Sequence, residues 1–147
     1  MPRLICTDEL DQLLTLYRVL HPDDPVVRDS LALRSLWEGM MSDPSLFVIV
    51  HEEEDEGELV SSCTLAVVKN LTRGCRPYGV VEKVITLPSY RRRGYGTLVL
   101  GEALRIAREQ GCYKVLLSTG AKDEDTLRFY EQAGFSRGIK TGFVALL

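Results

Sequence analysis

The chain has 147 residues, of which 45% are hydrophobic and 27% are charged, an ordinary balance for a soluble globular protein. Its formal net charge of -3 disfavours general nucleic-acid binding, which needs a basic face. No apolar run approaches the ~20 residues that span a bilayer. No signal peptide is visible, so we expect a cytoplasmic protein with no membrane partner. The length favours one domain over residues 1–147.

The cysteines give no sign of a metal centre. Cys6, Cys63, Cys75 and Cys112 form no C-x-x-C pair and lie far in sequence from the two histidines. This spacing is typical of reduced thiols rather than of a zinc site. We therefore expect no metal.

The N-terminal third predicts a short strand and two helices. Residues 1–6 form a plausible edge strand, and Thr7 is a favourable N-cap for a helix that ends near His21. A histidine could act as a catalytic base, but a position beside a proline at a helix end favours a capping role. A second helix is predicted over residues 29–41. Its Trp37 indicates either core packing or one wall of a substrate pocket.

Strands dominate the middle of the chain. Residues 46–50 and 59–68 predict two strands, joined by an acidic stretch at 51–58 that reads as a solvated hairpin tip. Residues 79–87 are nearly apolar on both faces, which is typical of a central strand. Glu82 and Lys83 interrupt that pattern, and we expect a bulge there.

The C-terminal half predicts a helix from Gly94 or Tyr95 to Gln110, then a strand over 112–118. Asp123 opens another helix, and residues 136–147 read as two closing strands. The element order predicts an α/β fold in which a mixed sheet carries helices on both faces.

The turn after the central strand carries the clearest chemical signal. Its sequence is Arg-Arg-Arg-Gly-Tyr-Gly over residues 91–96, directly before a helix. Amides at a helix N-terminus, together with arginines, bind phosphate groups, and three arginines suit a pyrophosphate. A P-loop needs a Lys-Ser or Lys-Thr that is missing here. A dinucleotide motif needs a third glycine where Val99 stands.

Arg91-x-x-Gly94-x-Gly96 resembles the acyl-CoA pyrophosphate signature of the GNAT superfamily of N-acetyltransferases. A second motif, Phe129-Tyr130 followed by Gly134-Phe135, resembles a helix of the same family, and the element order is also similar. The resemblance implies a mostly antiparallel sheet of six to seven strands with a splayed parallel pair. It also implies acetyl-CoA as co-substrate and a possible homodimer.

The resemblance further implies roles for individual residues. The backbone of Val84, Ile85 and Thr86 would pair with the pantetheine arm, and an amide near Ile85 would meet the oxyanion. The pyrophosphate turn would comprise Arg91, Arg92, Arg93, Gly94, Tyr95, Gly96 and Thr97.

Two side chains are the candidate catalytic residues. Tyr130 would protonate the departing thiolate, although core packing is the alternative. Glu82 is the best candidate base for the incoming amine, directly or through a water, and an ion pair with Lys83 or an arginine is the alternative. Asp123 stands where many family members have Asn, and an N-cap role is the simpler interpretation.

The leading hypothesis is an N-acetyltransferase that moves an acetyl group from acetyl-CoA to a primary amine of a small molecule. Direct attack in a ternary complex is the expected mechanism. The alternatives are acetylation of a protein N-terminus or lysine, and a non-catalytic acyl-CoA-binding sensor. The presence of both Tyr130 and Glu82 favours the enzyme.

Overall fold

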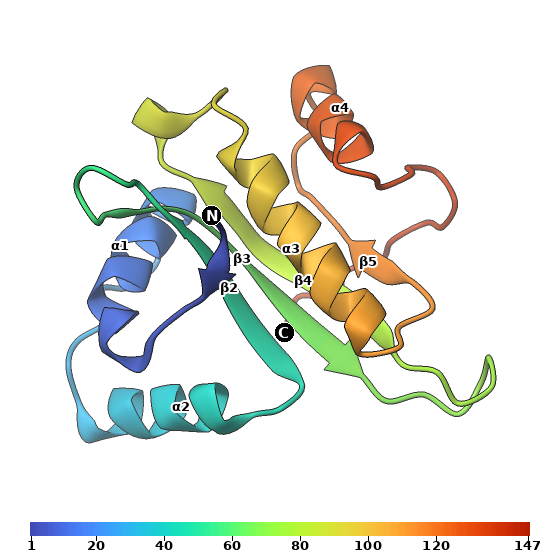
Figure 1. Cartoon of the computed structure of the whole chain (residues 1–147), viewed down its shortest axis with the longest axis horizontal. Helices are drawn as coiled ribbons and strands as arrows, with labels where there is room; N and C mark the ends of the chain where they lie inside the picture. Colours follow the sequence, from blue (N-terminus) through green and yellow to red (C-terminus); the bar gives the residue numbers. More distant parts are fainter.

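A computed structural model describes all 147 residues. Its centre is one five-stranded sheet in the order β1-β2-β3-β4-β5, antiparallel throughout except for the parallel pair β4–β5 (Figure 1). The strands are β1 (Arg3–Leu4), β2 (Leu46–Glu52), β3 (Leu59–Val68), β4 (Tyr78–Thr86) and β5 (Val115–Leu117).

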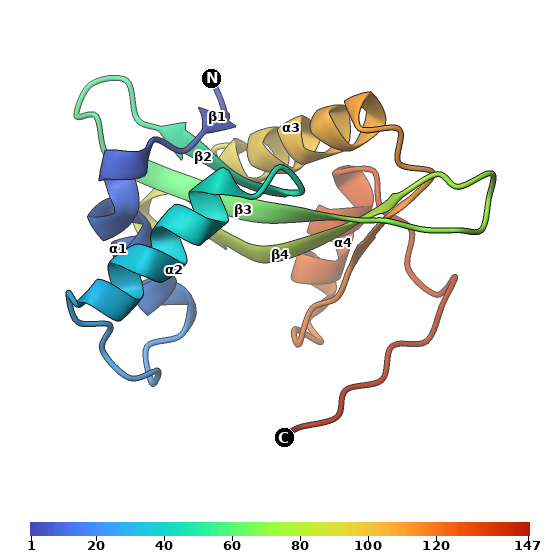
Figure 2. The same cartoon turned by 90° about the horizontal axis from the view of Figure 1, so that it is seen from below.

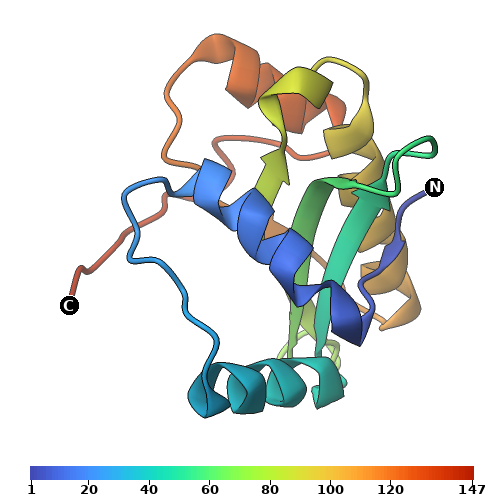
Figure 3. The ribbon, with the colours of Figure 1, turned by 90° about the vertical axis from the view of Figure 1, so that its left-hand side faces the viewer.

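Helices cover both faces of this sheet, which confirms the predicted mixed α/β architecture. Figures 2 and 3 show α3 on one face and α1 with α2 on the other. No helix is both long and apolar enough to cross a membrane. The helices are α1 (Leu10–Leu20), α2 (Leu31–Ser42), α3 (Tyr95–Glu109) and α4 (Glu124–Gln132), with 3-10 turns η1 (Thr7–Glu9) and η2 (Pro88–Tyr90).

Each face of the sheet has its own core. On the α3 side, β3 and β4 pack Leu65 and Val81 against Leu100 of α3, all nearly inaccessible to solvent. On the opposite side, Ile85 of β4 packs with residues of α1 and with Trp37 of α2. Trp37 is 5% exposed, so it belongs to the core. The β4 strand is therefore covered on both faces, as its apolar sequence predicts.

The first helical turn begins differently from the prediction. Thr7 lies inside η1, and Cys6 is the N-cap residue. The Cys6 amide donates to the Glu9 carboxylate at 2.7 Å, and Arg3 holds that carboxylate from the other side at 2.6 Å. The Thr7 N-cap prediction is wrong because Glu9, fixed by Arg3, satisfies the first free amide of the turn.

The sheet has five strands, and the expected six or seven are not confirmed. Residues 136–147 form no strand, and the chain here extends away from the body on the side opposite α3 (Figures 2 and 3). Phe143, Val144 and Leu146 are each more than four-fifths exposed. The apolar sequence of this segment has strand character, but the segment does not pair with β5. The outer edge of β5 is therefore left free.

Candidate active site

The parallel strands β4 and β5 separate beyond Val81. They pair only where Gly79, Val80 and Val81 meet residues of β5, whereas β4 continues to Thr86. The last five residues of β4 therefore have no partner on the β5 side. This gap confirms the splayed pair and offers an open strand edge to an extended ligand.

A bulge distorts β4 just beyond the point of separation. Thr64 pairs with Glu82 and Ser62 pairs with Ile85, so two residues of β4 lie opposite the single residue Cys63. Lys83 has a positive φ of 55°, which is uncommon for a residue with a side chain. The bulge predicted at Glu82 and Lys83 is confirmed, and it turns the end of β4 relative to β3.

Backbone alternation decides which amides face the open edge. The Leu87 amide donates to the Val60 carbonyl at 2.9 Å, and the Ser61 hydroxyl donates to the Ile85 carbonyl at 3.0 Å. Leu87 and Ile85 thus direct their polar groups toward β3. Because polar groups alternate along a strand, those of Val84 and Thr86 face the side that β5 leaves open.

The arginine turn joins the end of β4 to α3. The Arg91 guanidinium donates to the Thr86 carbonyl at 3.2 Å, which ties the turn to the strand. Arg92 and Gly94 both have positive φ, at 62° and 86°, and Gly94 is the N-cap of α3. Arg91, Arg92 and Arg93 are exposed, and none pairs with a carboxylate. Free cations thus stand beside the free amides of a helix N-terminus, an arrangement that suits phosphate oxygens.

Gly96 brings three elements together. A Cβ atom placed on Gly96 would lie 2.9 Å from the Phe129 ring and 3.4 Å from the Thr86 hydroxyl. The first turn of α3 can therefore approach both the end of β4 and α4 only because residue 96 has no side chain. This contact places Tyr130, the neighbour of Phe129, on the same side of the sheet as the turn.

Tyr130 is half-buried against the α3-side core. Its ring centroid lies 5.0 Å from that of Phe129. Burial raises the pKa of the Tyr130 phenol, and the hydroxyl of Thr119 partly opposes that rise. The phenol therefore keeps its proton at neutral pH, as a proton donor requires.

Glu82 lies in the open rather than in a buried site. Its side chain is 54% exposed, and its nearest ionic contact is with the Lys83 ammonium at 3.8 Å. Such a long, exposed pair contributes little stability. The carboxylate is therefore accessible from solvent at the bulge, on the face of the sheet that carries α1.

Cys63, opposite the bulge, has an unreactive thiol. It is fully buried, and its thiol donates to the Val99 carbonyl at a sulfur–oxygen distance of 3.4 Å. Burial raises the pKa of the Cys63 thiol to about 12. The thiolate that a nucleophile needs is absent at neutral pH.

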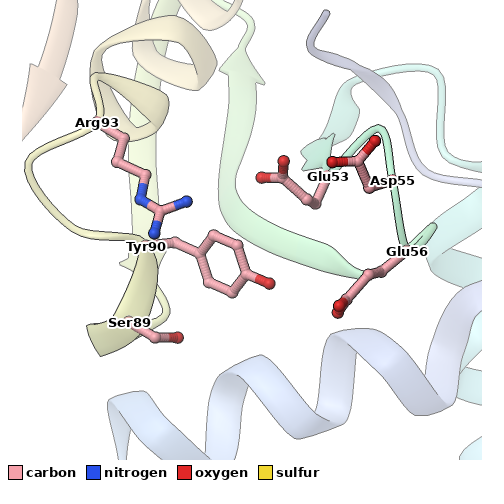
Figure 4. Close-up of a pocket in the computed structure, with 6 residues that line it drawn as sticks. All are labelled: Glu53, Asp55, Glu56, Ser89, Tyr90 and Arg93. Carbon is pink, nitrogen blue, oxygen red and sulfur yellow. The ribbon is translucent and has the colours of Figure 1, made fainter.

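A polar cavity of about 290 Å³ lies between the turn and the acidic hairpin tip (Figure 4). The acidic stretch was predicted to be a solvated hairpin tip, and Asp55 and Glu56 are exposed as expected. Glu53 differs because it accepts a hydrogen bond from the Tyr95 hydroxyl at 2.8 Å. Three carboxylates here would repel a phosphate, so this cavity does not suit an anionic ligand. The lining residues are Glu53, Asp55, Glu56, Ser89, Tyr90 and Arg93.

Other predicted positions have structural roles. Asp123 is the N-cap of α4 and accepts a hydrogen bond from the Thr126 amide at 3.0 Å, which confirms the N-cap interpretation. His21 is the C-cap of α1. Sequence reasoning missed a group of hydroxyls on the α1 side of the sheet, those of Tyr17, Ser62 and Thr64. The available signal was a run of polar residues within an otherwise apolar strand.

These features define a mixed sheet with a splayed parallel pair and an arginine- and glycine-rich turn at the start of a helix. The family model described as "Acetyltransferase (GNAT) family" matches residues 10–135. The chain belongs to the GNAT acetyltransferase family, whose members use acetyl-CoA.

Known proteins agree with this assignment. A putative acetyltransferase from Agrobacterium tumefaciens str. C58 is 39% identical, with a TM-score of 0.92 over 100% of this chain and 99% of that one. The glucosamine 6-phosphate N-acetyltransferase of Trypanosoma brucei brucei is 40% identical over 79 residues, or 54% of this chain. That match spans 52% of the relative, so the chain covers about half of its length.

A more distant solved structure shares the fold alone. The enzyme AAC(6')-Iy, solved with a bisubstrate analogue that contains CoA, is 18% identical with a TM-score of 0.80, over 100% of this chain and 97% of that one.

Proposed function

We propose that this chain transfers an acetyl group from acetyl-CoA to a primary amine of a small molecule, by direct attack in a ternary complex. The observation that carries this proposal is the meeting of three parts around Gly96. The open edge of β4, the arginine turn and the α4 helix with Tyr130 are in contact there. These parts would hold the thioester, the pyrophosphate and a proton donor, respectively.

The pantetheine arm would lie along β4 as an added strand. Val84 offers its amide and carbonyl on the open side and Thr86 offers its amide, since the Thr86 carbonyl already accepts from Arg91. Ile85 contributes packing below them. The pyrophosphate would sit on the amide side of the turn, held by residues 91–97. Arginine forms charge-assisted hydrogen bonds with phosphate oxygens, and the three arginines have no competing acidic partner.

The reaction needs three proton transfers: one from the ammonium, one to the departing thiolate and one from the nitrogen of the adduct. Glu82 takes a proton from the ammonium form of the acceptor, and the freed nitrogen lone pair then attacks the thioester carbonyl carbon. A β4 amide on the open side, from Val84 or Thr86, stabilises the oxyanion. The carbon–sulfur bond then breaks, and the CoA thiolate takes the proton of the Tyr130 phenol. The nitrogen of the adduct still carries two protons, and one of them passes through water to the tyrosinate, which leaves the neutral amide. The protonated Glu82 then releases its proton to solvent.

Direct attack is supported by the state of Cys63. It is the cysteine that lies opposite the bulge, and its buried, protonated thiol is a poor nucleophile. A covalent acetyl-enzyme on that thiol is therefore disfavoured, and the amine itself must reach the thioester.

The acceptor we propose is an amino sugar phosphate. The support is the similarity to the glucosamine 6-phosphate N-acetyltransferase of Trypanosoma brucei brucei. A panel of amines with thiol detection of released CoA tests this proposal. We expect glucosamine 6-phosphate to give the largest kcat/KM, with unphosphorylated glucosamine as the matched control. Turnover only with peptides would favour a protein acetyltransferase, and CoA binding without any turnover would favour a sensor.

We also propose that the chain forms a homodimer. The support is the exposed apolar segment at residues 136–147, together with the free outer edge of β5. Exposed apolar patches and unpaired strand edges mark surfaces that associate with another chain.

A further inference from the structure

Three hydroxyl groups gather on the α1 side of the sheet, next to the bulge. The Tyr17 hydroxyl of α1 lies 3.3 Å from the Thr64 hydroxyl of β3. Ser62 and Thr64 are alternate residues of one strand, so their side chains share a face. Cys63, between them, points to the opposite face, where it contacts α3.

Ser62 is unusual because its hydroxyl has no hydrogen-bond partner. The residue is 0% exposed, and its Oγ atom is one of two buried side-chain polar atoms without a partner. Buried hydroxyls are generally satisfied, and one left unsatisfied lowers stability. The Ser62 hydroxyl is therefore available to hydrogen-bond a polar group of a ligand.

The pKa of Tyr17 is affected by the hydroxyls of Thr64 and Ser62, which lie close to it. Burial raises the pKa of the Tyr17 phenol, and the neighbouring hydroxyls of Thr64 and Ser62 oppose that rise. Both hydroxyls thus lie beside the phenol, although Ser62 makes no bond of acceptable geometry with it. The Tyr17 phenol stays protonated at neutral pH, so it can both donate and accept hydrogen bonds.

The cluster continues to the candidate base. Thr64 lies directly opposite Glu82 in the β3–β4 ladder, and directly opposed residues share a face with their Cβ atoms about 5 Å apart. Glu82 is half-exposed, whereas Ser62 is fully enclosed. Glu82, Thr64 and Ser62 thus share one face of the sheet, in order from an exposed position to a fully enclosed one.

We propose that Tyr17, Ser62 and Thr64 form the subsite that positions the acceptor amine for attack. This inference rests on the proposed function. A primary ammonium carries three N–H donors, and Glu82, Thr64 and Tyr17 supply three oxygen acceptors around it. Ser62 gains the partner it lacks from a polar group of the bound acceptor.

The subsite also fixes the order of the chemistry. One N–H bond of the ammonium breaks as its proton moves to the Glu82 carboxylate, which forms an O–H bond. The lone pair left behind first faces Glu82, so the amine turns about its C–N bond to direct that lone pair at the thioester on β4. Thr64 and Tyr17 accept hydrogen bonds from the remaining N–H groups before and after this turn.

Steady-state kinetics with glucosamine 6-phosphate and acetyl-CoA test this role. In Tyr17→Phe, Thr64→Val and Ser62→Ala, we expect KM for glucosamine 6-phosphate to rise about tenfold or more, as for loss of a hydrogen bond to a charged group. KM for acetyl-CoA should stay within about twofold of the wild-type value, because the cofactor binds on other elements. Thr64→Ser keeps the hydroxyl and should retain the wild-type KM. Tyr113→Phe, remote from the bulge, is the matched control.

Thermal unfolding separates positioning from packing. Ser62→Ala removes an unsatisfied hydroxyl, so its Tm should equal or exceed that of the wild type while acceptor binding weakens. A structural role predicts the reverse, a lower Tm with unchanged acceptor KM.

Unchanged acceptor KM in all three variants overturns the subsite, and so does an equal rise in KM for both substrates. If glucosamine 6-phosphate is not a substrate of the wild type, the best amine of the panel takes its place in the same test. A wild-type protein that acetylates no amine at all rejects the proposed function, and the subsite falls with it.

Discussion

Two side chains beside the bulge differ in exposure, and that difference separates their chemistry. Cys63 is enclosed and its pKa is raised to about 12, so its thiol is inert at neutral pH. Glu82 is 54% exposed on the other face, where an acceptor can reach it. This contrast supports our proposal that the accessible carboxylate is the base, whereas the buried sulfur packs β3 against α3.

Tyr130 gives the sharpest prediction for a single residue. Tyr130→Phe keeps the ring and its packing but removes the proton that the thiolate needs. We expect kcat to fall about a hundredfold, in the usual range for loss of a general acid, with little change in KM for acetyl-CoA. Steady-state kinetics measure both values, and Tyr78→Phe at the other end of β4 is the control. Equal kcat in the Tyr130 variant and the wild type would remove the phenol from the mechanism.

At the scale of elements, Gly96 is the point where β4, α3 and α4 meet. Gly96→Ala would place a methyl group 2.9 Å from the Phe129 ring, so α4 must shift and carry Tyr130 with it. We expect a loss of about 1–3 kcal/mol in the free energy of unfolding, and a lower kcat.

Urea unfolding and kinetics measure the effect of this substitution. Gly101→Ala is the matched control, because it lies on the same helix with nothing within 4 Å of its Cβ position. That change should be neutral or slightly stabilising. A Gly96→Ala protein that behaves like Gly101→Ala would show that the three elements are not tightly joined.

The N-terminal elements depend on the ion pairs of Arg3. Its guanidinium bonds to Glu9 and to Glu52 of β2. The hydrogen bond from Arg3 is the main reason that the pKa of Glu9 falls from 4.5 to about 2. A lowered carboxyl pKa adds stability above pH 4.5 that is lost as the pH falls toward 2.

Arg3→Gln should therefore lower the free energy of unfolding by about 1 kcal/mol at neutral pH, and the difference should vanish near pH 2. Urea titrations across this range measure it. Arg34→Gln, which breaks a more exposed pair with Asp29, is the control and should show a smaller effect. A difference that does not change with pH would mean that the Glu9 ion pair is not its source.

Elements with local signals were predictable from sequence. Helix α3 begins after Gly94 and ends before Gly111, and both glycines have positive φ. The bulge in β4 was predicted from two polar residues, Glu82 and Lys83, in an apolar strand. The N-cap at Cys6 was missed because it depends on Arg3 and Glu9 meeting across a turn, which spacing alone does not reveal.

The candidate site also contains residues that the sequence predicts and residues that it does not. The arginine turn is contiguous in sequence and was found there, and Tyr130 lies in a recognisable motif. The hydroxyl cluster draws on Tyr17 of α1 and on two residues of β3, more than 40 positions away. The polar run in β3 is a local signal for Ser62 and Thr64, but only the packing of α1 on the sheet brings Tyr17 to them.

At the scale of the whole molecule, the segment 136–147 is the main unpaired apolar surface. Phe143 and Val144 are 92% and 84% exposed, which favours association with a second copy of the chain. We expect light scattering to give twice the chain mass for the wild type, and the chain mass alone for a Phe143→Asp, Val144→Asp double variant. Leu71→Asp, which is as exposed but lies in the β3–β4 loop, should remain dimeric. A monomeric wild type, or a dimeric double variant, would contradict the proposed dimer.

The central claim is that the open edge of β4, the arginine turn and Tyr130 act together to acetylate an amine. The most direct test is mass spectrometry of one reaction containing the protein, acetyl-CoA and glucosamine 6-phosphate. The account predicts an N-acetylated sugar phosphate, free CoA and a protein of unchanged mass. Acetyl-CoA that remains intact with every amine tried, or an acetyl group retained on the protein, would contradict it.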